Sequence, residues 1–150
     1  MNRGEYHIVV DVWTVNDKNE ILMTLRHPDK EYPNLWENTG GSILAGETSK
    51  QGAVRELFEE TGIRSTEDDL HYLGSIKEET AFVDTYINRK NMLISELTLQ
   101  DGETVDAQWV TLERLDELVR QGEVPLPVVL RLQPLRSKFE AFLFSRQVTK

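Results

Sequence analysis

A glycine-containing loop followed by a single helix, between Gly41 and Ile63, constrains this chain more than any other stretch. Thr48 stands where a helix N-cap is expected, and Gln51 follows three residues later, which is the pattern of a capping box. Residues 49–61 contain no proline, and Gly62 then offers the left-handed conformation that commonly ends a helix. The sequence therefore predicts a helix over residues 49–61 that is entered from a flexible loop.

The predicted helix has an apolar stripe and an acidic side. The residues expected in the buried stripe recur at helical spacing: Ala53, Val54, Leu57, Phe58 and Thr61. Glu56, Glu59 and Glu60 are three and four residues apart, so we expect them to share the other side. Glu47 lies just before the first turn and can approach the same patch if the loop folds back. Arg55 is a single cation set among these four carboxylates.

This concentration of acids has two explanations. Like charges at helical spacing destabilise a helix by roughly 0.2–0.5 kcal/mol per pair. A solvated acidic face tolerates that repulsion, whereas a bound divalent cation removes it, because hard cations take several oxygen ligands. The pattern thus indicates either a water-exposed helix face or a site for Mg²⁺ or Mn²⁺.

The spacing of the glycine, the glutamates and the arginine follows a known pattern. Gly41, five residues, Glu47, seven residues and then the run from Arg55 to Ile63 agree with it at every fixed position. Gly, Glu and Arg are each roughly 5–7% of an average protein, so such agreement by chance is rare. On these residues the chain resembles the Nudix hydrolase family, and its MutT-like members in particular.

The resemblance implies a fold and a reaction. The implied fold class is α/β with mixed α+β character, a Nudix-type αβα sandwich in which helices enclose a mixed central β-sheet. One domain is expected over residues 1–150. Nudix hydrolases cleave a diphosphate bond in a nucleoside diphosphate linked to another group, X, by attack of water on phosphorus. The implied cofactor is Mg²⁺ or Mn²⁺, and the implied partner is a small-molecule diphosphate.

The resemblance also implies roles for the acids and the arginine. Glu59 and Glu60 are expected to bind the metal, with Glu56 as a third ligand or as the general base. Glu47 is expected either to support a ligand from behind or to act as the base. Arg55 is expected to orient a carboxylate by hydrogen bonds, which is a structural role.

Further metal ligands are expected outside the helix. In the family, a backbone carbonyl at the start of the glycine loop commonly joins the metal, and Gly40 or Gly41 is the matching position. Many members add one acid from a later loop, and we choose Glu103, which stands six residues before Trp109. A solvated turn residue is the alternative interpretation of Glu103. The weaker candidates for this ligand are Glu78, Glu79 and Asp84.

The rest of the chain alternates between strand and helix patterns. The predicted strands are Tyr6–Val15, Ile21–Leu25, Leu35–Thr39, His71–Glu79, Phe82–Arg89 and Asp106–Thr111. Helices are predicted over residues 112–121 and 128–143, and Pro134 should break or kink the second. The apolar face expected to dock that helix consists of Leu135, Phe139, Phe142 and Leu143.

A loop with two prolines is predicted over residues 27–34. Loops above a rigid scaffold often carry specificity. Arg26, Lys30 and Tyr32 are therefore candidate contacts for the phosphate or the base of a substrate. Solvated side chains on a loop are the alternative interpretation of all three.

Two other functions are compatible with parts of the sequence. The approach to the loop resembles the isopentenyl-diphosphate isomerase-like branch of the same fold in five residues: Arg26, Lys30, Pro33, Trp36 and Thr39. Those isomerases use an active-site cysteine, and this chain has none. A non-catalytic diphosphate-binding module is the other alternative. A missing signature carboxylate would favour that module, and none is missing.

Charge and composition limit the partners. A net charge of −9 disfavours binding of a nucleic acid polymer through a basic face, and it would repel a diphosphate unless a metal bridges the two. No apolar run approaches membrane-spanning length, and the absence of cysteine fits a cytoplasmic protein. The family resemblance also suggests a homodimer. The identity of X does not follow from the sequence.

Overall fold

A mixed β-sheet forms the centre of the computed structural model, which describes residues 7–145. β1 (His7–Val15) pairs in parallel with β6 (Ala81–Arg89), and the other strand pairs of this range are antiparallel. The strand order is β3-β2-β1-β6-β5, while β4 pairs with β1 and β7 pairs with β2. A mixed sheet was predicted, and its order could not have been read from the periodicity of the strands.

The remaining elements have the following bounds. The strands are β2 (Ile21–Arg26), β3 (Trp36–Glu37), β4 (Thr39–Ser42), β5 (His71–Lys77) and β7 (Thr104–Val110). The helices are α1 (Ser49–Thr61), α2 (Leu112–Arg120), α3 (Leu126–Leu132) and α4 (Arg136–Ser145). Short 3₁₀ turns occupy Glu67–Asp69, Ile94–Glu96 and Gln133–Leu135. Across residues 7–145, every helix is too short or too polar to cross a membrane. Tyr6, the predicted first residue of β1, lies outside the described residues.

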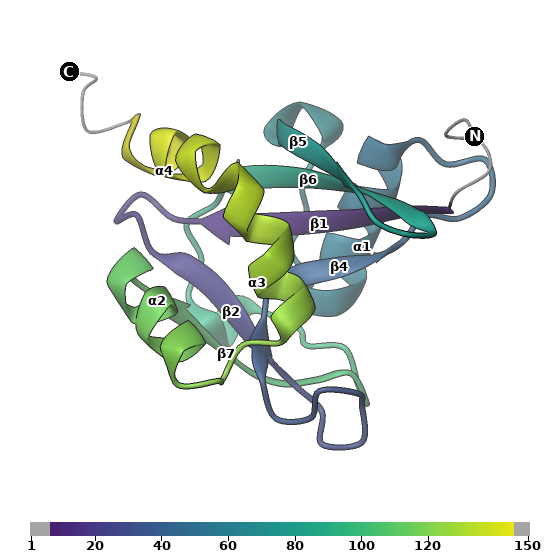
Figure 1. The fold of residues 1–150 in the computed structure, drawn as a ribbon. Coiled ribbons are helices and arrows are strands. Elements are labelled where there is room, and N and C mark those ends of the chain that lie inside the picture. The colour runs from purple at the N-terminus through teal and green to yellow at the C-terminus, as the bar shows by residue number, and fades with distance from the viewer. Residues whose placement is uncertain (1–6, 146–150) are drawn as a thin grey trace.

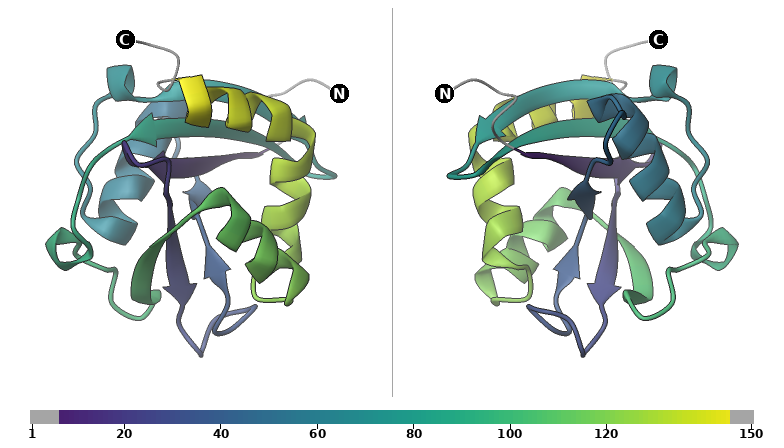
Figure 2. Two further views of the ribbon diagram at one scale, coloured as in Figure 1. Left: turned by 90° about the vertical axis from the view of Figure 1, so that its left-hand side faces the viewer. Right: turned by 90° about the vertical axis from the view of Figure 1, so that its right-hand side faces the viewer.

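Helices cover both faces of the sheet (Figures 1 and 2). α1 lies on one side, and α2, α3 and α4 lie on the other, as the two side views show. Residues of β1 alternate between two apolar clusters: Val10 and Val12 pack with α1, whereas Trp13 and Val15 pack with the other helices. Trp13 and Phe139 of α4 meet edge to face with ring centroids 5.5 Å apart. The predicted αβα sandwich is therefore confirmed.

The predicted helix over residues 49–61 is confirmed together with its caps. The Thr48 side chain accepts a hydrogen bond from the Gln51 backbone N–H, and the Gln51 side chain accepts one from the Thr48 N–H at 2.9 Å. Gly62 ends the helix with φ at 79°, in the left-handed region. α1 therefore begins and ends where local signals place it.

One residue predicted to lie in the buried stripe of α1 is exposed, and one acid predicted to face solvent is buried. Ala53, Leu57 and Thr61 are buried, but Phe58 is 42% exposed, and the Arg64 guanidinium lies 4.6 Å from its ring centroid. Glu60 is buried instead. The stripe runs through positions spaced by three and four residues from Ala53, and this spacing reaches Glu60 and bypasses Phe58.

The glycines predicted to open the loop belong to a strand. Gly40 and Gly41 lie in β4, where they face Asp11 and Val10 of β1 in antiparallel register. The predicted strand over residues 35–39 is accordingly two short strands, β3 and β4, separated by Asn38. Glycine suits this strand because a larger residue would have no room, as the geometry of the site shows below.

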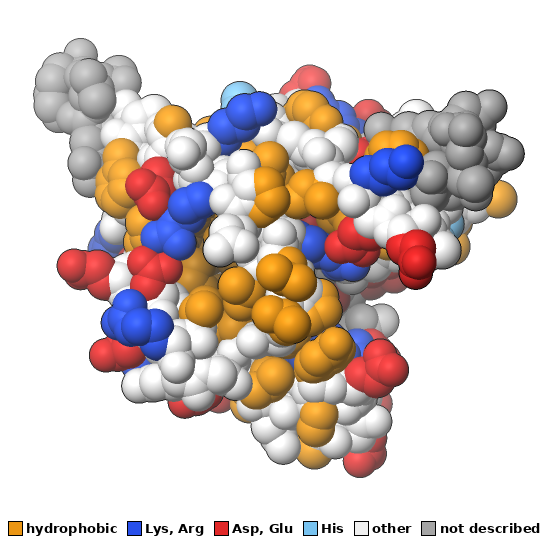
Figure 3. Space-filling model, viewed as in Figure 1, with side chains coloured by type: hydrophobic (Ala, Val, Ile, Leu, Met, Phe, Trp, Pro, Cys, Tyr) orange, Lys and Arg blue, Asp and Glu red, His pale blue; other side chains and the backbone are white. Residues whose placement is uncertain are grey.

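The C-terminal helix prediction is right about Pro134 and wrong about the helix start. A 3₁₀ turn containing Pro134 separates α3 from α4, and α3 already begins at Leu126 with Pro127 in its first turn. Of the predicted docking face, Leu135, Phe139 and Leu143 are buried, while Phe142 is partly buried. The outer side of α3 leaves Leu126 and Leu130 exposed, and hydrophobic side chains gather over α3 in Figure 3.

Candidate active site

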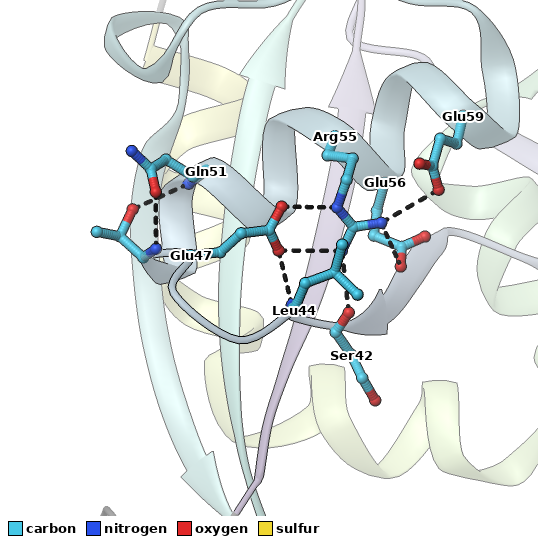
Figure 4. Close-up of polar contacts among 8 residues, drawn as sticks. Ser42, Leu44, Glu47, Gln51, Arg55, Glu56 and Glu59 are labelled. Carbon is cyan, nitrogen blue, oxygen red and sulfur yellow. Dashed lines mark hydrogen bonds and ion pairs between the residues drawn. The ribbon is translucent and has the colours of Figure 1, made fainter.

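Arg55 of α1 joins the glycine loop to the helix (Figure 4). Its Nε donates to Glu47 Oε2 at 2.7 Å and its Nη2 donates to Glu47 Oε1 at 3.1 Å, which makes a bidentate ion pair. Nη2 also donates to the Ser42 carbonyl at 3.1 Å, and the Leu44 backbone N–H donates to Glu47 Oε1 at 2.8 Å. The segment from Ser42 to Glu47 is therefore held against α1.

The same guanidinium contacts two more acids of the helix. Nη1 of Arg55 donates to Glu59 Oε1 at 3.1 Å and to Glu56 Oε2 at 3.4 Å. The hydrogen bond from Arg55 lowers the pKa of the Glu47 carboxyl, so Glu47 holds a proton less readily than a free glutamate. Glu47 is consequently better suited to hold the loop than to act as a base near neutral pH.

Glu56 packs against Gly41. A Cβ atom at Gly41 would lie 2.2 Å from Glu56 Oε2, so any larger residue would displace the carboxylate. Burial raises the pKa of Glu56, the charge of Arg55 opposes this, and the charge of Glu59 adds to it. A carboxylate with a raised pKa accepts a proton nearer neutral pH, which suits the predicted role of Glu56 as a base.

Glu60 is the most buried acid of the helix, at 8% exposure. Its Oε1 has no hydrogen-bond partner in the structure. Burial raises the pKa of Glu60 well above its usual range, and the charges of Glu37 and Glu56 raise it further. An unsatisfied buried carboxylate is expensive, because it loses water without gaining a partner. A cation is the ligand that would offset this loss.

The predicted metal ligands are only partly gathered. Glu56 lies close enough to Glu60 for its charge to add to the effect of burial on the pKa of Glu60, but Glu59 turns to Arg55, with its side chain 45% exposed. Over the described part of the chain, no three acidic or histidine side chains converge on one point as a ready-made metal site. The donor chemistry still fits a hard divalent cation, since the charges of Glu37 and Glu56 reach Glu60, whose Oε1 has no partner.

A cavity of about 230 Å³ opens beside Glu60. Its lining combines acids, cations and strand backbone: Val9, Asp11, Arg26, Lys30, Glu37, Asn38, Gly40, Gly41, Ser42, Glu60, Val128 and Arg131. A larger and shallower depression of about 610 Å³ runs between Asn16 and Trp109, but it includes none of the predicted site residues. The smaller cavity is the better candidate because the charges that chemistry on a diphosphate needs surround it.

Two of the three predicted substrate contacts line this cavity. Arg26 donates from Nη1 to Glu37 Oε1 at 2.7 Å, and Lys30 forms an ion pair with Glu103. Tyr32 is 46% exposed and is not part of the lining. Arg26 and Lys30 are thus placed where a phosphate could be reached, and each already has a carboxylate partner.

Glu103, the metal ligand predicted from a later loop, does not line the cavity, but it contacts Lys30, which does. Glu103 pairs with Lys30, and it is close enough to Glu37 for its charge to raise the pKa of that carboxyl. None of the weaker candidates lines the cavity: Glu78 pairs with the lining residue Arg131, Glu79 is exposed, and Asp84 accepts a hydrogen bond from Ser75. Glu103 therefore stays the preferred candidate and remains a prediction.

Three charged residues of the cavity were missed from the sequence: Asp11, Glu37 and Arg131. Asp11 is 3% exposed, and burial raises its pKa to about 6, against the charge of Arg131 and a hydrogen bond from Asn38. Because Asp11 lies in the middle of the apolar strand β1, the sequence could have indicated a buried acid with a function there. Arg131 gave no such signal, because its position depends on how α3 packs on the sheet.

Comparison with known proteins points the same way as this geometry. A family model described as NUDIX domain matches residues 5–132. An uncharacterised Nudix hydrolase of Listeria monocytogenes is 41% identical over 122 residues, which are 80% of this chain and 72% of that protein.

Solved structures share the fold. A crystal structure from Deinococcus radiodurans matches with a TM-score of 0.67 at 24% identity. The match covers 80% of this chain and 76% of the Deinococcus chain. The NUDIX domain of Shewanella oneidensis NrtR, solved as a complex with ADP ribose, matches with a TM-score of 0.69 at 16% identity. That match covers 89% of this chain and 88% of the NrtR chain. At these identities the likeness concerns the fold alone.

Proposed function

This chain belongs to the Nudix family, and we propose that it performs the family's hydrolysis with the acids around Arg55 and Glu60 and a bound Mg²⁺ or Mn²⁺. The substrate is a nucleoside diphosphate linked to another group, X, and the bond cleaved lies in its diphosphate bridge. Nudix hydrolases generally use divalent metal ions. The choice between Mg²⁺ and Mn²⁺ is part of the proposal, and so is a single domain over residues 1–150.

The unpartnered Oε1 of Glu60 carries this proposal. A carboxylate that is 8% exposed and has one buried oxygen without a hydrogen bond is destabilising unless a ligand of the working protein contacts that oxygen. Glu60 lines the cavity, and the charge of Glu56 reaches it, so an ion at this point would contact two carboxylates of one helix. We assign Glu59 as a further ligand after its side chain leaves Arg55.

The residues around the cation have three further roles: they position the loop, accept a proton and bind the phosphates. When bound, the cation supplies charge stabilisation for the phosphoryl oxygens and activates the attacking water. Arg55 and Glu47 hold the glycine loop in place, so they act on catalysis through position. Glu56 is our candidate for the group that accepts the proton of the water. Arg26 and Lys30 are candidates to meet the phosphates.

A substrate panel tests the proposed function. Nucleotide sugars, ADP-ribose, dinucleotide cofactors and nucleoside triphosphates are incubated with the protein and Mg²⁺ or Mn²⁺, and ³¹P NMR identifies which product carries each phosphate. We expect cleavage within a diphosphate bridge, loss of turnover in EDTA and its return with added metal. Turnover that persists in EDTA would remove the metal from the proposal. Tight binding without cleavage across the panel would favour the non-catalytic module instead.

No observation favours the isomerase alternative over hydrolysis. The chain has no cysteine for the active site of such an isomerase, and the signature carboxylates are intact. Formation of dimethylallyl diphosphate from isopentenyl diphosphate is measured in the same panel, and we expect none. The homodimer and the cytoplasmic location stay predictions that these residues do not decide.

A further inference from the structure

Asp11 is a buried acid in the wall of the cavity that the proposed mechanism does not use. It lies in the middle of β1, it is 3% exposed, and its Oδ2 has no hydrogen-bond partner. It shares the cavity with Glu60, whose Oε1 is unpartnered in the same way. Only the Glu60 oxygen is explained by the proposed cation, so Asp11 needs a separate explanation.

Three other elements build the space around Asp11. Gly40 of β4 faces it in register, and a Cβ atom at Gly40 would lie 3.2 Å from Asp11 Oδ1. Arg131 of α3 lines the same cavity, and Glu78 anchors it by accepting from Nε at 2.8 Å and from Nη2 at 3.0 Å. Two strands, a helix and the residue after β5 thus cooperate to place a carboxylate and a guanidinium at one cavity.

We propose that Asp11 accepts a hydrogen bond from a hydroxyl or amino group of the substrate, so that this hydrolase is specific for diphosphates with a polar end group. The inference rests on the proposed function. Asn38 and the charge of Arg131 stabilise the Asp11 carboxylate in part, but its buried Oδ2 has no donor, and a donor on the substrate would relieve that cost. Arg131 supplies the complementary donor, which suits a group that carries both donors and acceptors, as sugars and bases do.

The size of the cavity limits what enters it. At about 230 Å³ it is smaller than the roughly 300–1,000 Å³ of sites that enclose a drug-sized ligand, so it takes one end of the substrate. An apolar end group, such as an alkyl or isoprenoid chain, would leave Asp11 Oδ2 desolvated and without a donor. Sites built to hydrogen-bond a substrate group discriminate strongly against analogues that lack it.

A bound water is the competing explanation. Thr85 of β6 lies beside Asp11 in parallel register, and its Oγ1 also lacks a partner. One water that bridges Asp11 and Thr85 could satisfy both groups without any substrate. Under that explanation Asp11 affects folding alone, whereas under the proposal it affects which diphosphates are cleaved.

The test compares Asp11→Leu, which removes the acceptor at similar volume, with Asp11→Asn, which keeps one acceptor oxygen. The polar probes are ADP-ribose, UDP-glucose, NADH and ATP, and the apolar probe is P¹,P²-dihexyl diphosphate. Thr14→Val is the control, because Thr14 is a buried polar residue of β1 outside the cavity lining. kcat/KM is measured for each probe with Mg²⁺, and thermal melting confirms folding.

We expect wild type to prefer at least one polar probe over the dihexyl compound. Asp11→Leu should lower kcat/KM for that probe by about ten-fold or more while dihexyl diphosphate is cleaved no more slowly, and Asp11→Asn should lie between. Asp11→Leu should melt at or above the wild-type temperature, since it removes a buried acid with one unpartnered oxygen.

An unchanged preference in Asp11→Leu overturns the inference and leaves the proposed function standing. A wild-type preference for the dihexyl compound, or an equal loss for both kinds of probe, also overturns it. A folded wild type that cleaves no diphosphate contradicts the proposed function, and the inference falls with it. A Thr14→Val variant that shifts the preference as strongly as Asp11→Leu would show that the effect is not specific to the cavity.

Discussion

The acids of this site fall into two groups that the protein treats in opposite ways. Glu47, Glu56 and Glu59 all accept hydrogen bonds from Arg55 at the surface of α1. Glu60 and Asp11 are buried at the neighbouring cavity, and each keeps an oxygen without a partner. The first group is stabilised by the protein itself, whereas the second lacks something that the protein does not supply.

This difference separates residues that shape the site from residues that receive a ligand. An ion pair at the surface costs little and fixes the loop, so its acids can be explained by structure alone. A buried carboxylate oxygen without a partner costs about 1–3 kcal/mol or more, and such a cost is retained where function requires it. Glu60 is accordingly assigned to a cation and Asp11 to the substrate.

The largest effect is expected from Glu60→Gln, which removes the charge of one of the two buried acids. Removing the charge should lower Mg²⁺-dependent kcat/KM by about 100-fold or more, since it removes a proposed metal ligand. The apo variant should melt no lower than wild type, because a buried unpaired charge is gone. Glu113→Gln at an exposed position of α2 is the control. Equal activity of Glu60→Gln and the control would contradict the assignment.

A smaller effect is expected from Arg55→Lys, which disrupts the hydrogen bonds that Arg55 donates to the acids at the surface of α1. Lysine cannot reproduce the bidentate contact with Glu47 while also reaching Ser42 and Glu59. We expect a loss of about 10–100-fold in metal affinity or activity, as is usual for residues that orient a ligand. Isothermal titration calorimetry with Mn²⁺ measures the metal affinity, and steady-state kinetics measure the activity. A loss as large as that of Glu60→Gln would mean that the two groups are not distinct.

The third prediction concerns the pH dependence of stability through Asp11. Its folded pKa of about 6 exceeds the ordinary value of 3.8, so the group is less destabilising when protonated. In EDTA, the stability of wild type relative to Asp11→Asn should fall as pH rises from 4 to 6 and then level off. The full change is on the order of 3 kcal/mol. Urea denaturation across this range measures it, and a flat difference would contradict the burial of an ionisable Asp11.

The smallest effect is expected from Glu78→Gln at the anchor of Arg131. The hydrogen bond from Arg131 lowers the pKa of Glu78, so its stabilisation should be lost as pH falls through that lowered pKa, opposite in sign to Asp11. Both side chains are partly exposed, which limits the effect to about 1 kcal/mol or less at pH 7. Urea denaturation at pH 7 and pH 3 checks this, and a difference that grows on acidification would be the contrary result.

Local signals explain why one part of the site was predictable. Thr48, Gln51 and Gly62 act within a few residues of α1, so the helix and its caps could be derived from the sequence. The contacts of Arg55 also follow from neighbours on one loop and one helix. The family resemblance supplied the sandwich and the reaction class, which spacing alone does not give.

The other part depends on contacts between segments far apart in the chain. Asp11 reaches the cavity through the register of β1 with β4, and Arg131 does so through the packing of α3. The exposure of Phe58 and the burial of Glu60 were missed for a related reason. An apolar stripe was sought among apolar residues, and a functional acid occupied one of its positions.

The most direct test is a crystal of the protein soaked in Mn²⁺, with data collected for the anomalous signal of manganese. The account predicts a peak within bonding distance of Glu60, with Glu56 on the same ion and the unpartnered oxygen satisfied. A manganese site elsewhere, with Glu60 Oε1 still without a partner, would contradict it.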